Sequence, residues 1–215
     1  MASRREFLQV GIAALALPIS AHAALSPAAD APEKTAPVTP LYKVVYDERF
    51  RASVAFGTEA RRLGLPTHSI RGDITDLWFH DLDAQWKRKP VAVAGLTAQG
   101  ALFCLERLAW DHGMRVVFRG DHQYQPLGVI EHVVTGPENV VHQAASLQNE
   151  GDDWAPRVAN LVARISERQS TPAKVTIHGR ATAPADAEAE DLISWVIAPV
   201  AGARILRKAQ LIHGT

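Results

Sequence analysis

Charged side chains follow several short apolar runs of this sequence, and their types could bind a polar ligand or transfer a proton. Arginine guanidinium groups and carboxylates can orient a polar ligand through paired hydrogen bonds. A histidine beside them titrates near neutral pH, and together with the carboxylates it could serve as the acid or base of a hydrolase or an isomerase. The candidate ligand-binding residues are Asp47, Arg71, Asp73, Thr97, Arg119, Asp121 and His122.

A second interpretation of the same residues is structural. Arg71 can pair with Asp73, and Arg119 with Asp121, so that each pair closes a turn at the glycine between its members. Charged residues are common in surface loops, and most of them carry out no chemistry. The sequence leaves both interpretations open and assigns no catalytic residue.

The only cysteine of the chain, Cys104, also has two interpretations. Near the start of a predicted helix, the pKa of its thiol would be lowered and the thiolate could act as a nucleophile. Its spacing from Ala101, Leu105 and Leu108 instead places it on the apolar face of that helix, which predicts a buried and inert thiol. A single cysteine excludes a disulfide within the chain, and it disfavours iron–sulfur clusters and structural zinc sites.

Two further arrangements could hold an ion. The loop 95–100 precedes a helical pattern, so its backbone N–H groups could bind an anion, although it has no phosphate-binding fingerprint and a tight turn is the simpler interpretation. The aspartates and His122 could bind a metal, but Arg71 and Arg119 would compete with the cation. We therefore predict neither a metal nor a cofactor.

Alternating strand and helix patterns must position these residues. Four apolar strand patterns occur at residues 42–46, 66–70, 91–94 and 114–118, and helical spacing occupies residues 49–63, 74–88 and 100–112. This alternation predicts an α/β fold with a mostly parallel open sheet and helices on both faces, which is a Rossmann-like or flavodoxin-like architecture. Ligands of such sheets bind outside the carboxyl ends of the strands, so the candidate residues should share one edge.

The second half of the chain predicts a less regular α+β portion. Strand patterns occur at residues 129–134, 174–178 and 192–200, and helical patterns at residues 137–147 and 154–168. Residues 24–40 are rich in alanine and proline without an apolar period, which predicts a disordered linker. We expect a single α/β domain over residues 41–215.

The N-terminus carries a targeting pattern. Residues 3–9 read Ser-Arg-Arg-Glu-Phe-Leu-Gln, an apolar stretch follows, and residues 21–23 form a small-x-small peptidase site. This pattern resembles the twin-arginine signal peptide, with Gln9 where that family often has lysine. The resemblance implies export of the folded chain to the periplasm and cleavage after Ala23. A general secretory signal that carries two arginines is the alternative.

Composition excludes some classes of partner. The chain has 23 basic and 23 acidic residues, so it lacks the charge surplus that proteins use to bind nucleic acid or anionic membranes. No apolar run beyond the N-terminus is long enough to cross a bilayer, so we expect no stable membrane anchor after cleavage. The expected partners are a periplasmic protein or a small polar ligand.

Three functions fit this sequence. Its export signal, without a cofactor or catalytic fingerprint, favours a non-catalytic ligand-binding or accessory protein, for example one that escorts a periplasmic oxidoreductase. The alternative is a periplasmic hydrolase or isomerase that uses Asp73, Asp121 or His122 at the carboxyl edge of the sheet. The third is an independent solute-binding module, for which the chain is short, because a two-lobed binding protein needs two such sheets.

Overall fold

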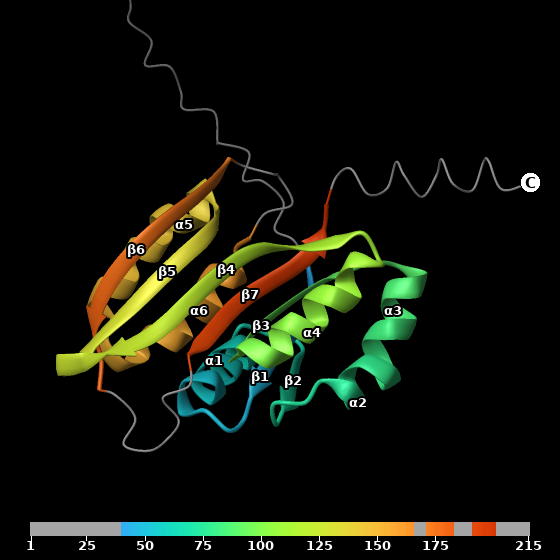
Figure 1. The fold of residues 1–215 in the computed structure, drawn as a ribbon, viewed down its shortest axis with the longest axis horizontal. Coiled ribbons are helices and arrows are strands. Elements are labelled where there is room, and N and C mark those ends of the chain that lie inside the picture. Colours follow the sequence, from blue (N-terminus) through green and yellow to red (C-terminus); the bar gives the residue numbers. More distant parts are fainter. Residues whose placement is uncertain (1–39, 166–170, 183–190, 201–215) are drawn as a thin grey trace, which may run out of the picture. The chain divides into compact units, whose positions relative to one another are not determined.

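The computed structural model describes residues 40–165, 171–182 and 191–200. A seven-stranded sheet with the order β2-β1-β3-β7-β4-β5-β6 forms the centre of this part of the chain (Figure 1). The strands are β1 Leu41–Asp47, β2 Thr67–Ile70, β3 Ala92–Ala98, β4 Met114–Gln125, β5 Val129–Pro137, β6 Pro172–Arg180 and β7 Leu192–Pro199. The helices are α1 Arg51–Arg62, α2 Thr75–Leu77, α3 Asp83–Arg88, α4 Gln99–Trp110, α5 Glu138–Ala144 and α6 Trp154–Val162.

The predicted mostly parallel, Rossmann-like or flavodoxin-like sheet is wrong, because the sheet is mixed and mostly antiparallel. Only β2, β1 and β3 are parallel neighbours. The last strand, β7, lies between β3 and β4 and is antiparallel to both, and β4, β5 and β6 form an antiparallel meander. A continuous apolar strand such as β7 suits a central position that is buried on both faces, but its sequence does not indicate which strands it separates.

The fourth strand is longer than the sequence predicts. We expected it to end at Phe118, before a turn at Arg119-Gly120-Asp121, but β4 continues to Gln125. Buried Phe118 and Gly120 alternate with partly exposed Arg119 and Asp121, as in any strand with one buried face. Gly120 serves close packing here, because an added Cβ would lie 2.6 Å from the hydroxyl oxygen of Ser194.

Local sequence patterns explain the helices well. The glycines that follow α1 and α4, Gly64 and Gly113, have φ angles of +76° and +69°, which residues with a side chain rarely adopt. The predicted helix 74–88 is interrupted by a π-helical segment, Trp78–Leu82, between α2 and α3. Its expected apolar stripe nevertheless buries Leu77, Leu82 and Trp86.

Two apolar layers cover the sheet. One face, which we call the α6 face, packs against α1, α5 and α6, and the α4 face packs against α4 and the α2–α3 segment. Trp154 is the largest buried side chain of the first layer, and Trp86 and Trp195 are the largest of the second. Among the described residues, no helix covers the α4 face of β5 and β6 (Figure 1).

The predicted signal peptide, residues 1–23, and all but the last residue of the predicted linker, residues 24–40, lie outside the described residues. In the described part of the chain, none of the helices has the length and apolar character needed to cross a membrane.

Candidate functional site

Three candidate residues lie at one level of the sheet, on its α4 face. Asp47 ends β1 and is level with Thr97 of β3, because the residues that precede them are paired. Thr97 lies opposite Ile193 in β7, which in turn lies opposite Asp121 in β4. Neighbouring strands are about 4.8 Å apart, which places Asp47 and Asp121 about 14 Å from each other. The sheet therefore aligns these residues in one row without bringing them into one pocket.

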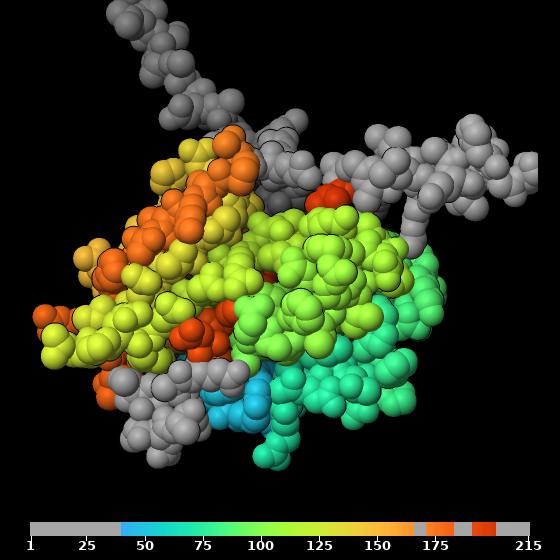
Figure 2. All heavy atoms as spheres, viewed as in Figure 1, coloured from blue at the N-terminus to red at the C-terminus, as the bar shows by residue number. Residues whose placement is uncertain are grey.

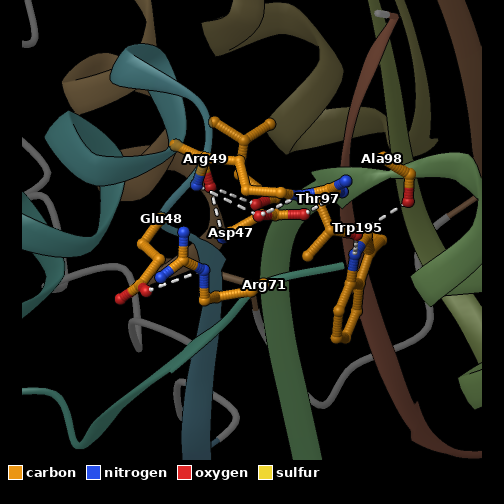
Figure 3. A network of polar contacts seen from close by, with 9 residues as sticks. Asp47, Glu48, Arg49, Arg71, Thr97, Ala98 and Trp195 are labelled. Carbon is orange, nitrogen blue, oxygen red and sulfur yellow. Dashed lines mark hydrogen bonds and ion pairs between the residues drawn. The ribbon is translucent and has the colours of Figure 1, made fainter. Parts of the chain in front are cut away.

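A charged cluster surrounds Asp47, whose side chain is fully buried (Figure 3). Its Oδ1 accepts hydrogen bonds from the backbone N–H and the Nε–H of Arg49, at 3.2 and 2.9 Å, and its Oδ2 accepts one from Nη2 at 2.7 Å. The N–H of Asp47 donates to the hydroxyl of Ser53 at 2.7 Å, and this hydroxyl donates to the carbonyl of Leu96. The Ser53 hydroxyl thus ties the end of β1 to β3, and the ion pair closes the β1–α1 connection beside it.

The cluster continues to the end of β2. The Nε atom of Arg71 lies 3.5 Å from a carboxylate oxygen of Glu48, and both side chains reach solvent, with 79% and 42% of their surface exposed. Arg49 lies against Gly72, since a Cβ at this glycine would be 2.6 Å from its Nη2 atom. Surface ion pairs contribute little to stability, so Arg71 can exchange its partner at small cost.

Asp73 does not join this cluster. Its Oδ1 accepts hydrogen bonds from the N–H and the hydroxyl of Thr75, at 2.8 and 2.7 Å, at the start of α2. These bonds lower the pKa of the exposed Asp73 carboxyl group. Asp73 therefore shapes its own turn, and it does not pair with Arg71 as the structural interpretation expected.

Thr97 is a packing residue. We expected it in the loop after β3, but it lies inside β3 and is fully buried. Its hydroxyl accepts a hydrogen bond from Nε1 of the equally buried Trp195 at 3.0 Å and donates to the carbonyl of Ala98 at 3.1 Å (Figure 3). The hydroxyl of Thr97 and the indole N–H of Trp195 thereby both have hydrogen-bond partners within the protein.

Arg119 and Asp121 form the ion pair that the structural interpretation expected, but within a strand rather than at a turn. Residues two apart in a strand point to the same face. The Nε of Arg119 lies 3.1 and 3.0 Å from the two carboxylate oxygens, and its Nη2 donates to one of them at 2.6 Å and to the side-chain oxygen of Gln99 at 3.1 Å. Asp121 raises the pKa of Arg119, and Gln99 links the pair to the start of α4.

His122 points to the opposite, α6 face and lies in a buried polar network. Its Nε2 is 2.8 Å from the hydroxyl oxygen of Ser194, and its Nδ1 is 2.7 Å from the Nδ1 of His132. The indole ring of Trp154 covers both imidazoles, with ring centroids 4.4 and 5.4 Å away. The other ring nitrogen of His132, Nε2, is buried and has no hydrogen-bond partner among the described residues.

Burial keeps both imidazoles neutral at physiological pH. Desolvation, together with the facing His132, lowers the pKa of His122 well below its usual value. Desolvation lowers the pKa of His132 to about 4. The order Ser194, His122, His132 has the connectivity of a nucleophile, a base and an orienting group, but all three side chains are enclosed in the core. We therefore assign this network to the packing of the core.

Sequence reasoning missed His132 and Ser194. The ten-residue separation of His122 and His132 matches no helix or strand period, yet the β4–β5 hairpin places them directly opposite each other. A signal did exist, because every second residue of this segment, Ile130, His132 and Val134, lies on the buried face of β5. Ser194 occupies a buried position in the apolar run of β7, where only tertiary structure shows what it contacts.

The prediction of a buried Cys104 is wrong, since the side chain is exposed on α4. This helix buries Ala101, Leu102, Leu105 and Ala109, so its apolar face is turned away from Cys104. Within the described residues, no group of three or more histidine, cysteine, aspartate or glutamate side chains could hold a metal ion.

Replacing Asp47 by alanine should destabilise the fold by about 2 kcal/mol, because it removes the acceptor of three hydrogen bonds at a buried position. Urea unfolding, followed by circular dichroism, measures the change. The matched control is Glu48→Ala, which removes the exposed neighbouring carboxylate and should change stability by less than about 0.5 kcal/mol. Equal effects of the two substitutions would contradict the anchoring role of Asp47.

The residues that lie together at the carboxyl edge are thus Asp47, Glu48, Arg49 and Arg71, with Thr97 level with Asp47 on the neighbouring strand β3. Comparisons with protein-family models, curated proteins and solved structures find no match for this chain.

Proposed function

We propose that this chain is an exported periplasmic protein that binds a small anionic ligand at the edge formed by the ends of β1 and β2, and that it acts by binding rather than by catalysis. The observation that carries the proposal is the arrangement of two guanidinium groups at this edge. Arg49 is held by the buried carboxylate of Asp47, with 40% of its side chain exposed, and Arg71 extends into solvent beside the same strand ends.

Guanidinium groups recognise carboxylates and phosphates through pairs of parallel hydrogen bonds. Arg71 is the proposed contact, because the one ion pair that it forms among the described residues is a long one, with the exposed Glu48. Arg49 contributes a second guanidinium group in a fixed position, since Asp47 holds it through two side-chain nitrogens. A ligand carboxylate or phosphate would replace Glu48 as the partner of Arg71, and the Arg71 guanidinium would remain partly exposed to solvent.

The positions of the acid–base candidates support binding over catalysis. Asp121 and His122 are consecutive residues of a strand, so they point to opposite faces of the sheet. Asp121 is paired with Arg119, His122 is enclosed beneath Trp154, and Asp73 is bonded to its own turn. A single substrate would not reach these groups together.

The export part of the proposal rests on the sequence of the first 23 residues, with the arginine pair Arg4-Arg5 and the small residues that end at Ala23. The twin-arginine route carries folded proteins, which suits a protein that needs no further assembly outside the cytoplasm. Replacing both arginines by lysine should leave the chain in the cytoplasm, as fractionation of the cells would show.

A thermal-shift and calorimetry series tests ligand binding, with inorganic phosphate, succinate and glutamate as probes. A ligand at 100 times its dissociation constant stabilises the folded state by about 2.7 kcal/mol. We expect stabilisation by at least one probe and its loss in Arg71→Ala, with the unfolding temperature of the free protein unchanged because the side chain is exposed.

Lys174→Ala is the matched control, because it removes an exposed cation from β6, at the far edge of the sheet from β2. This variant should bind as the unaltered protein does. Equal responses of the two variants would contradict the proposed site, and no response to any of the anions would contradict the proposed ligand class.

A further inference from the structure

The outer face of α4 carries large side chains that the fold does not bury. Phe103 and Trp110 are 56% and 43% exposed, and they lie seven residues apart on the same side of the helix. Between them, Arg107 lies over the indole ring of Trp110, with its guanidinium carbon 4.2 Å from the ring centroid. Figure 2 shows the surface of α4, in green, at the front of the molecule.

We propose that this face of α4 is a contact surface for a second copy of the same chain, with the two helices antiparallel about a twofold axis. We call it the α4 stripe and define it as Phe103, Glu106, Arg107 and Trp110. The proposal is independent of ligand binding at the ends of β1 and β2, because none of these four residues belongs to that cluster.

The order of side chains in the α4 stripe argues for a second copy. Along the helix the order is aromatic, acidic, basic, aromatic. An antiparallel copy reverses this order, so that Phe103 meets the partner's Trp110 and Glu106 meets the partner's Arg107. The twofold axis repeats both contacts, and a surface that is complementary to itself in this way suits a symmetric dimer.

The residue types of the α4 stripe suit an interface. Tryptophan and arginine are enriched among the residues that contribute most to binding, and the tryptophan ring buries a large surface. Arg107 is already positioned on Trp110, and the guanidinium of Arg115 lies 5.5 Å from the same ring. Trp110 is therefore held in place before association, which reduces the entropy lost on binding.

The α4 stripe and its surroundings carry charges of both signs. Glu106 is half-buried beside Arg119, whose pKa it raises, and Asp111 follows Trp110 at the end of the helix. Each copy thus brings both signs of charge to the contact. A surface with charges of a single sign would repel its own copy, and the mixed charges of the α4 stripe avoid this repulsion.

Sedimentation equilibrium over a range of protein concentrations, applied to the purified chain, tests the proposal. We expect a monomer–dimer equilibrium, and we expect Trp110→Ala and Phe103→Ala each to weaken it by about 30-fold or more. The matched control is Phe79→Ala, which removes another exposed aromatic side chain, from the π-helical segment, and should leave the equilibrium unchanged. We expect a dissociation constant in the micromolar range. A chain that is still monomeric at about 100 times that concentration would overturn the proposal.

A charge exchange tests the antiparallel arrangement itself. Glu106→Lys leaves two basic residues at the centre of the stripe, and Arg107→Glu leaves two acidic ones, so each variant alone should repel its own copy and remain monomeric. Mixed in equal amounts, the two variants should form a heterodimer. A mixture that stays monomeric, or single variants that still dimerise, would contradict the proposed contact.

Cys104 supplies an independent measurement, because it is exposed beside Phe103. Its reaction with a maleimide should slow as the protein concentration rises, and Trp110→Ala should abolish this dependence. If removal of residues 201–215, rather than dilution, exposes Cys104 and Trp110, the tail of the same chain covers the stripe and the dimer proposal is wrong.

Discussion

Lowering the pH from 7 to 4 is expected to reduce the free energy of unfolding by about 3 kcal/mol through His132 alone, with a further loss from His122. Both pKa values are lowered by burial in the folded state, that of His132 to about 4. The histidine pKa values of the unfolded chain are near 6.5. Between about pH 6.5 and pH 4, the unfolded chain therefore binds more protons than the folded chain. This part of the stability is complete above pH 6.5 and is lost as the pH falls towards 4.

Urea unfolding at pH 7, 6, 5 and 4 measures this loss. His132→Gln should make the dependence shallower, because its amide can still bond to His122 but does not titrate in this range. The control is His178→Gln, which changes an exposed histidine beside Glu131 and should leave the slope unaltered. An unchanged slope in His132→Gln would contradict the proposed origin of the acid sensitivity.

Other titratable groups also contribute to the pH dependence of stability, and their contributions can be separated from that of His132. Half-burial lowers the pKa of His68, so this residue adds a smaller loss in the same range, which His68→Gln isolates. Hydrogen bonds from Arg62 lower the pKa of Glu59 to about 2, so its contribution is lost only below pH 4.5. A loss of stability between pH 6.5 and 4.5 therefore reports on the histidines.

Replacing Gly95 by alanine is expected to destabilise the protein by about 3 kcal/mol. The added Cβ would lie 2.4 Å from Cζ2 of Trp195 and 2.8 Å from the carbonyl oxygen of Val45. Neither group can move easily, because Trp195 is fully buried and bonded to Thr97, and the carbonyl belongs to the neighbouring strand. Overfilling a packed core usually costs 1–3 kcal/mol, and these contacts belong to the upper end of that range, about 3 kcal/mol.

The matched control is Gly100→Ala, in the first turn of α4. No atom lies within 4 Å of the added Cβ, so stability should be unchanged or should rise by up to about 1 kcal/mol through the better helix propensity of alanine. Combining Gly95→Ala with Trp195→Leu should cost less than the sum of the single changes, because the smaller side chain relieves the contact. Strict additivity would contradict the proposed contact between Gly95 and Trp195.

The local elements could be predicted from the sequence because each follows from the spacing of apolar residues and from helix-ending glycines. The patterns at 42–46, 66–70 and 100–112 correspond to β1, β2 and α4. The error at Arg119-Gly120-Asp121 arose because glycine beside charged residues is typical of a turn. In β4 the glycine instead makes room for Ser194, a contact that lies 74 residues away in the sequence.

The candidate edge was predicted in part. The sequence aligned Asp47, Thr97 and Asp121 correctly, because β1, β3 and β4 do run in the same direction. It did not separate His122 from Asp121, although consecutive strand residues face opposite sides, because β4 was expected to end before them. Arg49, which completes the cluster around Asp47, was not singled out, since one arginine after a strand resembles any other surface charge.

The sequence by itself indicated where most strands and helices lie, and it contains the arginine pair Arg4-Arg5 and a single cysteine. Only the tertiary structure decided that β7 enters between β3 and β4, that Cys104 faces solvent, and that His122, His132 and Ser194 meet in the core. The physical reason is that apolar periodicity records how much of a segment is buried and on which side. It does not record which distant segment buries it, because any strand of suitable length satisfies the same backbone hydrogen bonds.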